Sequence, residues 1–278
     1  MRLGIFAKTF AAIGAEPSLQ AVAAAGYQGA QFNLACLGLP SMPDAIGPEV
    51  AAAVGEASRR TGIVIEAVSG TYNMIHPDPA VRSQGMRRLE ILCAAAPAMG
   101  TRLVTLCTGT RDTDDQWRWH ADNATPDAWR DLCTETTTAL EIAERFDVDL
   151  GIEPELANVV ASAADARRLI ETMASPRLRV VLDPANLFEV AEPAERRRLV
   201  DEAVDLLAGS IAMAHAKDRD PRGGFTAAGR GVIDFSHFVA RLRGIGFDGP
   251  LVTHGLSEIE AKGVAVHLGG IIAESGGR

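Results

Sequence analysis

Four side chains of the types that bind divalent metals occur at regular intervals in the second half of the chain. They are Glu153, Asp183, His215 and His254, and each stands near the end of a short apolar run. Their separations of 30, 32 and 39 residues are close to the ~31 residues that one strand-plus-helix unit takes in an eight-unit barrel. Since the carboxyl ends of the strands of such a barrel meet at one mouth, we expect the four to bind one metal ion together. Each alone has a structural alternative, because strand-end carboxylates often cap helices and single histidines often lie in the core.

A divalent ion held in this way favours one kind of chemistry, the removal of a proton next to a carbonyl. The ion chelates the ketone and the neighbouring hydroxyl oxygen, and it stabilises the enediolate that forms. Two carboxylates and two neutral imidazoles balance the charge of one divalent ion (Mn, Zn, Co, Fe or Mg), and imidazole favours the transition metals over Mg. His254 is expected both as a ligand and as a catalytic residue, because imidazole titrates near neutral pH.

Apolar runs rich in Val, Ile and Leu alternate with helical stretches along the whole sequence. Four such runs precede the ligand-bearing ones, at residues 3–7, 30–35, 63–68 and 102–107. The clearest helix candidates cover residues 48–61, 80–99, 126–146 and 163–173. This alternation predicts an α/β fold, a single (β/α)8 TIM barrel over residues 1–278. No Gly-x-Gly-x-x-Gly motif opens the first helix, which disfavours a dinucleotide-binding sheet.

Two connections, at about residues 108–126 and 216–233, are longer than the others and follow strand ends on the predicted active side of the barrel. Loops of this length are uncommon unless functional, so we expect both to cover a substrate; a surface excursion is the alternative. The polar residues that they bring to the mouth are Arg111 and His120 in the first loop and Lys217 and Arg230 in the second.

Further polar residues near strand ends point to the same mouth. The predicted substrate contacts among them are Asn33, Asn73, His76, Glu155 and Asn186. Asn73 and His76 could equally hold their loop through bonds from side chain to backbone. Glu155 faces the same way as Glu153 if the strand continues, which makes it an alternative base or a partner of a ligand. Pro154 can instead end the strand and leave Glu155 in solvent.

The composition excludes several other classes of function. The 278 residues are 47% hydrophobic and carry a net charge of −9 without a Lys/Arg-rich run, so no nucleic-acid partner is expected. No apolar stretch approaches the ~18 residues of a membrane span, and the first run is too short for a signal peptide. We therefore expect a cytoplasmic protein with no membrane contact. The four cysteines have no paired spacing and are expected to be reduced thiols.

Over essentially its whole length the chain resembles the xylose-isomerase-like TIM-barrel superfamily, which includes sugar phosphate isomerases and epimerases. The motifs that carry the resemblance are Glu-Pro-Glu at Glu153, Asp-Pro-x-Asn at Asp183, His-x-Lys-Asp at His215 and Gly-Arg-Gly-x-Ile-Asp from Gly229 to Asp234. The resemblance implies a metal-dependent isomerase or epimerase that acts on a small-molecule sugar, such as a ketose or keto-inositol, with Glu153 as both ligand and base. It also implies assembly as a homodimer or homotetramer.

Two positions depart from the pattern of the superfamily. His254 stands where relatives usually have a second glutamate, and Asn186 stands where many have a histidine. A two-base epimerase uses that glutamate on the far face of the carbon, so its absence keeps a dehydratase or lyase acting on a keto sugar or oxidised glycoside as the alternative. A metal-dependent endonuclease is disfavoured, because it needs a zinc cluster and the chain has six histidines and an acidic balance. A partner-dependent, non-catalytic subunit is the third alternative.

Overall fold

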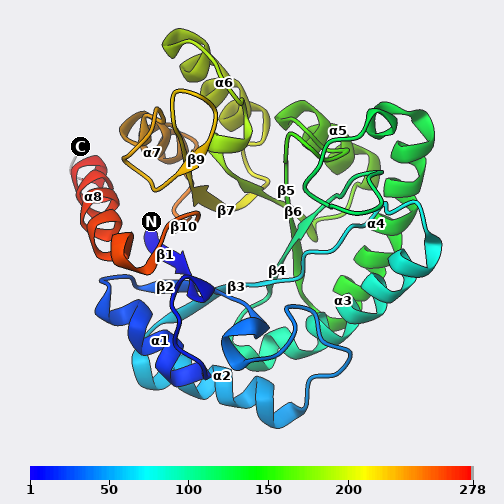
Figure 1. Cartoon of the computed structure of the whole chain (residues 1–278), viewed down its shortest axis with the longest axis horizontal. Helices are drawn as coiled ribbons and strands as arrows, with labels where there is room; N and C mark the ends of the chain where they lie inside the picture. Colours follow the sequence, from blue (N-terminus) through cyan, green and yellow to red (C-terminus); the bar gives the residue numbers. More distant parts are fainter. Residues whose placement is uncertain (277–278) are drawn as a thin grey trace.

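The computed structural model describes residues 1–276 and contains a closed barrel of eight parallel strands surrounded by helices (Figure 1). The barrel strands are β1 (Arg2–Phe6), β2 (Gly29–Phe32), β3 (Val64–Ser69), β4 (Leu103–Cys107), β5 (Asp149–Glu153), β6 (Leu178–Leu182), β7 (Ile211–Ala216) and β10 (Pro250–Thr253). Consecutive barrel strands are neighbours, and the ring closes where β1 pairs with β10. After β7, the short strands β8 (Asp218–Arg219) and β9 (Phe225–Thr226) form an antiparallel hairpin. This architecture confirms the predicted (β/α)8 TIM barrel.

The described chain has one long helix after each barrel strand, and together these helices form the outer layer (Figure 1). They are α1 (Ala15–Ala24), α2 (Pro48–Thr61), α3 (Pro79–Met99), α4 (Pro126–Phe146), α5 (Ala163–Met173), α6 (Pro193–Leu206), α7 (Phe235–Gly244) and α8 (Glu258–Gly276). The bounds of α2, α4 and α5 are as predicted. Helix α3 begins one residue earlier, because Asp78 caps it by accepting a hydrogen bond from the Ala80 backbone N–H and because Pro79 suits a first turn.

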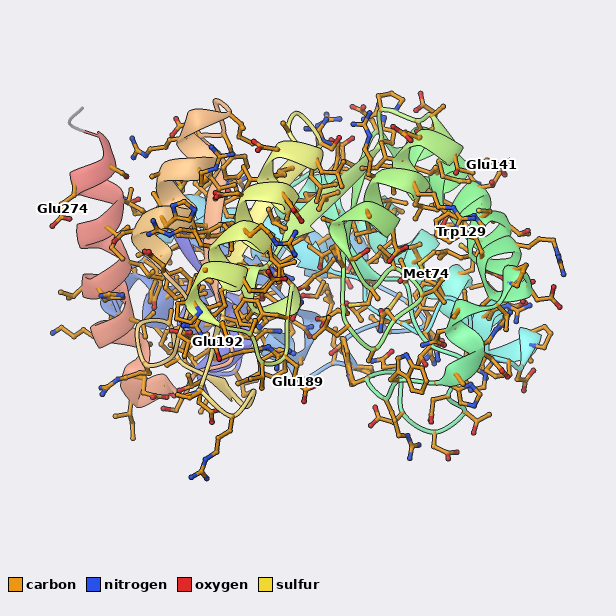
Figure 2. All side chains as sticks on the ribbon, turned by 90° about the horizontal axis from the view of Figure 1, so that it is seen from above. Met74, Trp129, Glu141, Glu189, Glu192 and Glu274 are labelled. Carbon is orange, nitrogen blue, oxygen red and sulfur yellow. The ribbon has the colours of Figure 1, made fainter. Side chains whose placement is uncertain are left out.

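The helices present polar faces to solvent and apolar faces to the barrel. In the side view of Figure 2, the exposed carboxylates of Glu141 on α4 and Glu274 on α8 point away from the barrel on opposite sides of the molecule. A large apolar core fills the space between strands and helices, with outward strand residues such as Leu106, Ile152 and Leu182 in it. Within residues 1–276, no helix combines the length and the apolar character needed to cross a membrane.

Inside the barrel, the two-residue period of the strands separates an apolar layer from a polar one. The apolar layer is a separate buried cluster made of Ala67, Leu103, Val181, Met213 and Val252. Two residues further along three of these strands stand Asp183, His215 and His254, which therefore point into the same interior. Below Glu153 the corresponding residue is Gly151, where an added Cβ would come within 2.9 Å of Val181. The candidate ligands thus stand on a packed apolar floor.

Candidate metal centre

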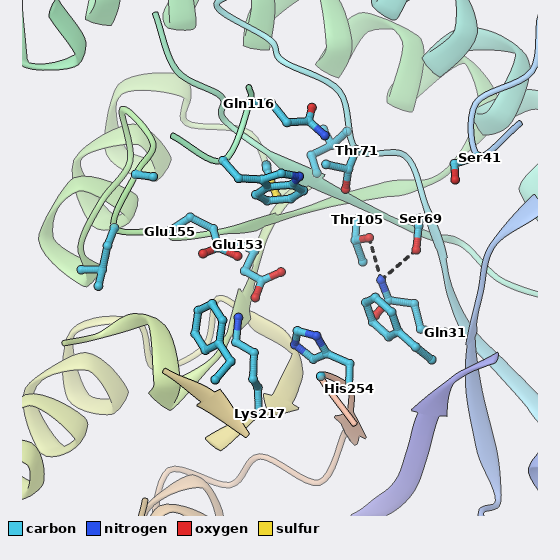
Figure 3. Close-up of a pocket in the computed structure, with 18 of the residues that line it drawn as sticks. Gln31, Ser41, Ser69, Thr71, Thr105, Gln116, Glu153, Glu155, Lys217 and His254 are labelled. Atoms are coloured by element: carbon cyan, nitrogen blue, oxygen red, sulfur yellow. Dashed lines mark hydrogen bonds between the residues drawn. The ribbon is translucent and has the colours of Figure 1, made fainter. Parts of the chain in front are cut away.

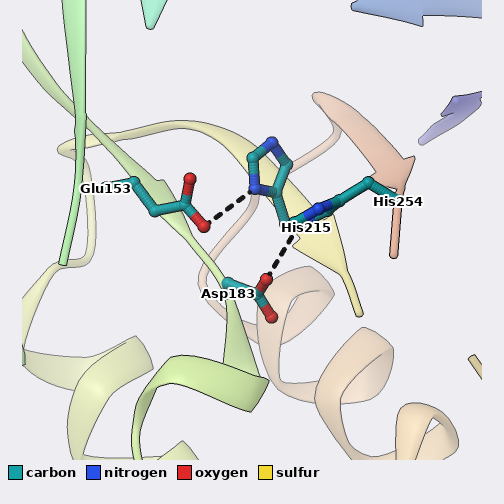
Figure 4. Close-up of side chains that lie close together, drawn as sticks. All are labelled: Glu153, Asp183, His215 and His254. Carbon is teal, nitrogen blue, oxygen red and sulfur yellow. Dashed lines mark hydrogen bonds and ion pairs between the residues drawn. The ribbon is translucent and has the colours of Figure 1, made fainter. Parts of the chain in front are cut away.

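The structure brings together the four side chains that the sequence places at successive strand ends (Figure 4). Glu153 is the last residue of β5 and His215 lies in β7, whereas Asp183 and His254 directly follow β6 and β10. Each offers one ligand atom within 4.8 Å of those of the others. Glu153, Asp183 and His215 are buried and His254 is half-buried, so the cluster is largely shielded from water.

One oxygen of Glu153 is held by two neighbours. Its Oε1 accepts a hydrogen bond from Asn186 Nδ2 at 2.9 Å and lies 3.1 Å from His215 Nδ1 (Figure 4). Burial alone raises the pKa of this carboxyl, but the attraction of His215 and Lys217 outweighs burial, and the net pKa is lowered. Glu153 is therefore ionised at neutral pH.

Asp183 uses its two oxygens differently. Oδ1 accepts a hydrogen bond from the Ala185 backbone N–H at 2.9 Å, which starts the short 3-10 turn η4 (Pro184–Asn186). Oδ2 lies 3.2 Å from His254 Nε2 and 3.6 Å from Lys217 Nζ. Burial raises the pKa of Asp183, but Lys217 and His254 outweigh it and hold the pKa well below its usual range. Burial, together with repulsion from His215, lowers the pKa of His254, so its ring is neutral and offers a lone pair.

The orientation of His215 is set by a residue that the sequence analysis missed. His215 Nε2 lies 2.9 Å from Gln31 Oε1, and Gln31 Nε2 donates to Ser69 Oγ at 3.1 Å and Thr105 Oγ1 at 3.0 Å (Figure 3). Because an amide oxygen only accepts, His215 carries its proton on Nε2. Nδ1 then faces Glu153. A polar residue inside the otherwise apolar strand β2 was the available indication in the sequence.

The donor set fits a divalent cation. His215 Nδ1 lies 3.1 Å from Glu153 Oε1, so the two atoms can share a cation or, without one, a proton on Nδ1. Ligand bonds of ~2.0–2.2 Å place opposite donors up to ~4.4 Å apart, so a spread within 4.8 Å needs only a small contraction. Asn186 Oδ1 beside the cluster is also buried without a partner among residues 1–276. Two carboxylates with two imidazoles favour a transition metal such as Mn, Zn, Co or Fe.

The cluster opens into a cavity of about 1080 Å³ at the carboxyl ends of the strands (Figure 3). Glu153 and His254 line it, as do the predicted substrate contacts Asn33, Glu155 and Lys217. Asn33 also accepts a hydrogen bond from the Ala35 backbone N–H, which ends β2 at Phe32 and starts the 3-10 turn η2 (Leu34–Leu37). The predicted run at residues 30–35 is therefore a strand only in its first half.

Glu155 reaches this cavity although the strand does not continue to it. Strand β5 ends at Glu153, and a turn follows in which the Glu155 backbone N–H donates to the Val160 carbonyl at 3.1 Å. The Glu155 carboxyl, that of Glu153 and the Cys107 thiol each offer an atom within 4.8 Å of the others. Burial and the negative charge of Glu153 raise the pKa of Glu155 to about 8. Two adjacent carboxyls thus differ in protonation at neutral pH, Glu153 ionised and Glu155 protonated.

Four predicted contacts in the third and fourth loops lie outside the cavity lining and hold the loops instead. Asn73 Nδ2 donates to the Thr110 carbonyl at 2.8 Å, and its Oδ1 accepts from the Thr110 N–H at 3.0 Å. His76 bonds the Thr113 carbonyl at 3.1 Å. The other two residues are Arg111, which pairs with Asp131 at 2.6 Å, and His120, which caps the 3-10 turn η3 (Ala121–Ala124). For Asn73 and His76, these contacts fit the loop-holding alternative.

The last two predicted substrate contacts, Asn186 and Arg230, do not line the cavity. Asn186 donates to Glu153, so it positions a candidate ligand. Arg230 is exposed on the loop after β9 and is not among the lining residues. The cavity lining also includes Trp117, Trp119 and Phe225, aromatic residues from the two long loops.

Known proteins share the family and fold of this chain. The xylose isomerase-like TIM barrel family matches residues 19–264. A solved structure of L-ribulose 3-epimerase has a TM-score of 0.77 at 19% identity, covering 99% of this chain and 95% of that one. The apo form of 3-keto-D-glucoside 4-epimerase YcjR from E. coli has a TM-score of 0.75 at 15% identity, covering 97% and 99%. The IolI protein, solved with a zinc atom bound, has a TM-score of 0.73 at 15% identity, covering 99% of both chains. No curated protein sequence matches the chain.

Proposed function

This chain belongs to the xylose isomerase-like TIM barrel family, and from that premise we propose that it is a metal-dependent isomerase or epimerase of keto sugars. The observation that carries the proposal is the convergence of Glu153, Asp183, His215 and His254 in one cluster, of which two members, Glu153 and His254, line a large cavity. Two of the similar structures are sugar epimerases by name, and a third holds zinc. The metal ion of this chain and its sugar are part of the proposal.

The proposed base is Glu153. Its carboxyl is ionised and lines the cavity, and only Oε1 is hydrogen-bonded within residues 1–276. Oε2 is therefore free to take a proton from a carbon next to a carbonyl. The cation, when bound by the four ligands, supplies positive charge that polarises the carbonyl and stabilises the negative charge on its oxygen.

The proton must return from one of the groups around the same carbon. In an isomerisation Glu153 itself returns it, whereas an epimerisation needs a donor on the opposite face. His254 is our proposed second group when the ion is held by Glu153, Asp183 and His215 alone, because its ring then can carry the proton and is positioned by stacking on Phe6 with 4.7 Å between ring centroids. Lys217 Nζ, 3.6 Å from Asp183, brings a further positive charge to the cavity and suits an oxygen that becomes negative.

A dehydratase or lyase is the second candidate, and Glu155 is the observation that favours it. Elimination needs a base for the C–H proton and an acid for the leaving hydroxyl. Glu153 and Glu155 offer an ionised and a protonated carboxyl within 4.8 Å of one another. Neighbouring carboxyls whose environments drive their pKa values apart commonly serve as such a base and acid.

Solvent exchange tests the proposal and separates the two candidates. Purified protein loaded with Mn or Zn is incubated in D2O with a panel of ketoses, 3-keto-glucosides and keto-inositols, and products are followed by NMR and ultraviolet absorbance. Deuterium uptake without loss of water supports isomerisation or epimerisation, whereas a conjugated-carbonyl absorbance supports elimination. Neither signal on any substrate, with metal bound, contradicts both candidates and leaves the non-catalytic alternative.

Glu153→Gln identifies the base in the same assay. We expect exchange to fall by about 10²–10⁴-fold, the usual contribution of a general base. The matched control is Glu66→Gln, since Glu66 is a buried glutamate of β3 that pairs with Arg2 at 2.8 Å and does not line the cavity. Equal exchange in both variants assigns the proton transfer to another group.

A further inference from the structure

Three exposed aromatic side chains gather at one place on the molecule. Trp117, Trp119 and Phe225 are 50%, 61% and 54% exposed, and within residues 1–276 they are the exposed aromatic residues. All three line the cavity above the candidate metal centre. Exposed aromatic surface is unfavourable in water, and its concentration at one cavity indicates a surface that binds flat or apolar groups.

The loop that carries the two tryptophans is held in one conformation by its own hydrogen bonds. Asp112 Oδ1 accepts from the backbone N–H groups of Asp114 and Asp115, both at 2.9 Å, and from Arg118 at 2.7 Å. The Trp117 backbone N–H donates to Asp115 Oδ1 at 2.9 Å. These bonds fix the backbone on both sides of Trp117, so the loop backbone needs little ordering when a ligand binds.

We call Trp117, Trp119 and Phe225 together the aromatic rim of the cavity. Phe225 belongs to the second long loop. It lies on β9, which pairs with β8, and two cations pack on its ring: Lys217 Nζ at 4.0 Å and Arg219 at 4.2 Å from the centroid. The aromatic rim therefore draws on both long loops, at 108–126 and 216–233.

The cavity has two chemically different depths. Its floor holds buried charged groups, among them Glu153 and Lys217, whereas the three aromatic residues are half-exposed at its opening. Its volume of about 1080 Å³ slightly exceeds the ~300–1,000 Å³ typical of sites for drug-sized ligands and is more than a single sugar ring requires.

We propose that the substrate is a glycoside, with a keto-sugar ring at the metal centre and a second flat ring stacked on Trp117, Trp119 and Phe225. The inference rests on the proposed function for the identity of the inner ring. The second ring is either an aryl group or another sugar, since both present a flat apolar face to an indole. A free monosaccharide would leave the aromatic rim in water.

Binding of unreactive glycosides tests the rim separately from turnover. Calorimetric titration of the metal-loaded protein compares methyl β-D-glucoside, phenyl β-D-glucoside and cellobiose. We expect one of the two-ring probes to bind at least tenfold more tightly than the methyl glucoside, and the tighter of them identifies the outer ring as aryl or sugar. Equal affinities for all three probes, or no binding of any, overturns the proposal.

Variants of the rim locate the effect. Trp117→Ala and Trp119→Ala should each reduce the two-ring preference by about 2–10-fold, as expected for one aromatic stacking contact, and leave methyl glucoside binding unchanged. Trp117→Phe should retain most of the preference for two-ring probes that Trp117→Ala loses. Trp129→Phe is the control, because Trp129 lies on α4 under Arg168, 3.7 Å from its ring, and outside the cavity. A preference unchanged in both alanine variants overturns the assignment to the tryptophans.

The two hypotheses fail in different ways. If two-ring probes bind more tightly but no substrate exchanges protons, the proposal for the aromatic rim stands and the proposed isomerase or epimerase activity is rejected. If free ketoses exchange protons but two-ring probes bind no more tightly, the proposed activity stands and the proposal for the aromatic rim is rejected.

Discussion

Gln31 Oε1 accepts a hydrogen bond from His215 Nε2 at 2.9 Å, and this contact decides which nitrogen of His215 faces the carboxylates. Gln31 is itself held by the hydroxyls of Ser69 and Thr105, so the ring is oriented through three neighbouring strands. Partners of this kind, behind a histidine ligand, fix its tautomer and direction.

Replacing Gln31 should therefore weaken metal binding. Gln31→Leu keeps the size of the side chain but removes the acceptor, and we expect affinity for Zn or Mn to fall by about 10–100-fold. Competition with a chelator measures the dissociation constant without any substrate. Gln28→Leu is the control, because Gln28 is exposed three residues earlier. Equal metal affinity in the two variants contradicts the role of Gln31.

Replacing His254 by glutamate should change the metal preference. The added carboxylate increases affinity for Mg by roughly tenfold or more, since a charge a few ångströms from the ion is worth more than ~1.4 kcal/mol even at an effective dielectric constant of ~20. The lost nitrogen donor disfavours Zn. Titration of each variant with Mg and with Zn gives the ratio of the two dissociation constants. The control is His267→Glu, which lies on the exposed face of α8 and should bind both ions as the wild type does. If His254→Glu has the same affinities for Mg and Zn as this control, His254 is not a ligand.

Glu155 should give the metal-free protein a distinct dependence of stability on pH. Its folded pKa of about 8 lies above the ordinary value of 4.5, so the folded state binds more protons than the unfolded state between these values. The free energy of unfolding contributed by this group therefore decreases as pH rises through that window, by up to ~1.4 kcal/mol per pH unit. Urea unfolding from pH 5 to 8 with a chelator present should show a steeper loss for the wild type than for Glu155→Gln. Parallel curves contradict the raised pKa.

Asn73→Ala should reduce stability without changing metal affinity. The Asn73 amide satisfies both the N–H and the carbonyl of Thr110, which is buried. Removing the amide leaves two buried backbone groups without their partner, and we expect a loss of about 2–4 kcal/mol. Thermal unfolding gives the stability and chelator competition gives the metal affinity. A loss of metal affinity with unchanged stability would contradict this loop-holding role and support a role for Asn73 in binding.

The sequence predicted the barrel and the four clustered residues because both depend on spacing. A strand-plus-helix unit has a nearly constant length, and strand ends of a closed parallel barrel share one mouth. Asp183 and His254 could therefore be placed together although 71 residues separate them. Helix bounds were predictable where proline and a capping side chain coincide, as at Pro126.

Pairings between loops could not be predicted in this way. Arg111 contacts Asp131 on α4, and nothing in the spacing of the two residues indicates that their side chains meet. Gln31 was missed because a single polar residue in a four-residue strand has no period of its own. Glu155 reaches the cavity through a turn that the alternation of a strand does not describe. Such contacts depend on the path of individual loops rather than on repeated elements.

The position of β10 between β1 and β7 has a consequence for biosynthesis. His254 follows β10 and stacks on Phe6 of β1, so the last of the four candidate ligands follows the strand that closes the ring. A nascent chain still short of residue 254 has only three of the four candidate ligands, beside an open β1 edge that can pair wrongly. An ion that needs all four candidate ligands would therefore bind only after β10 has been made and that edge has been closed.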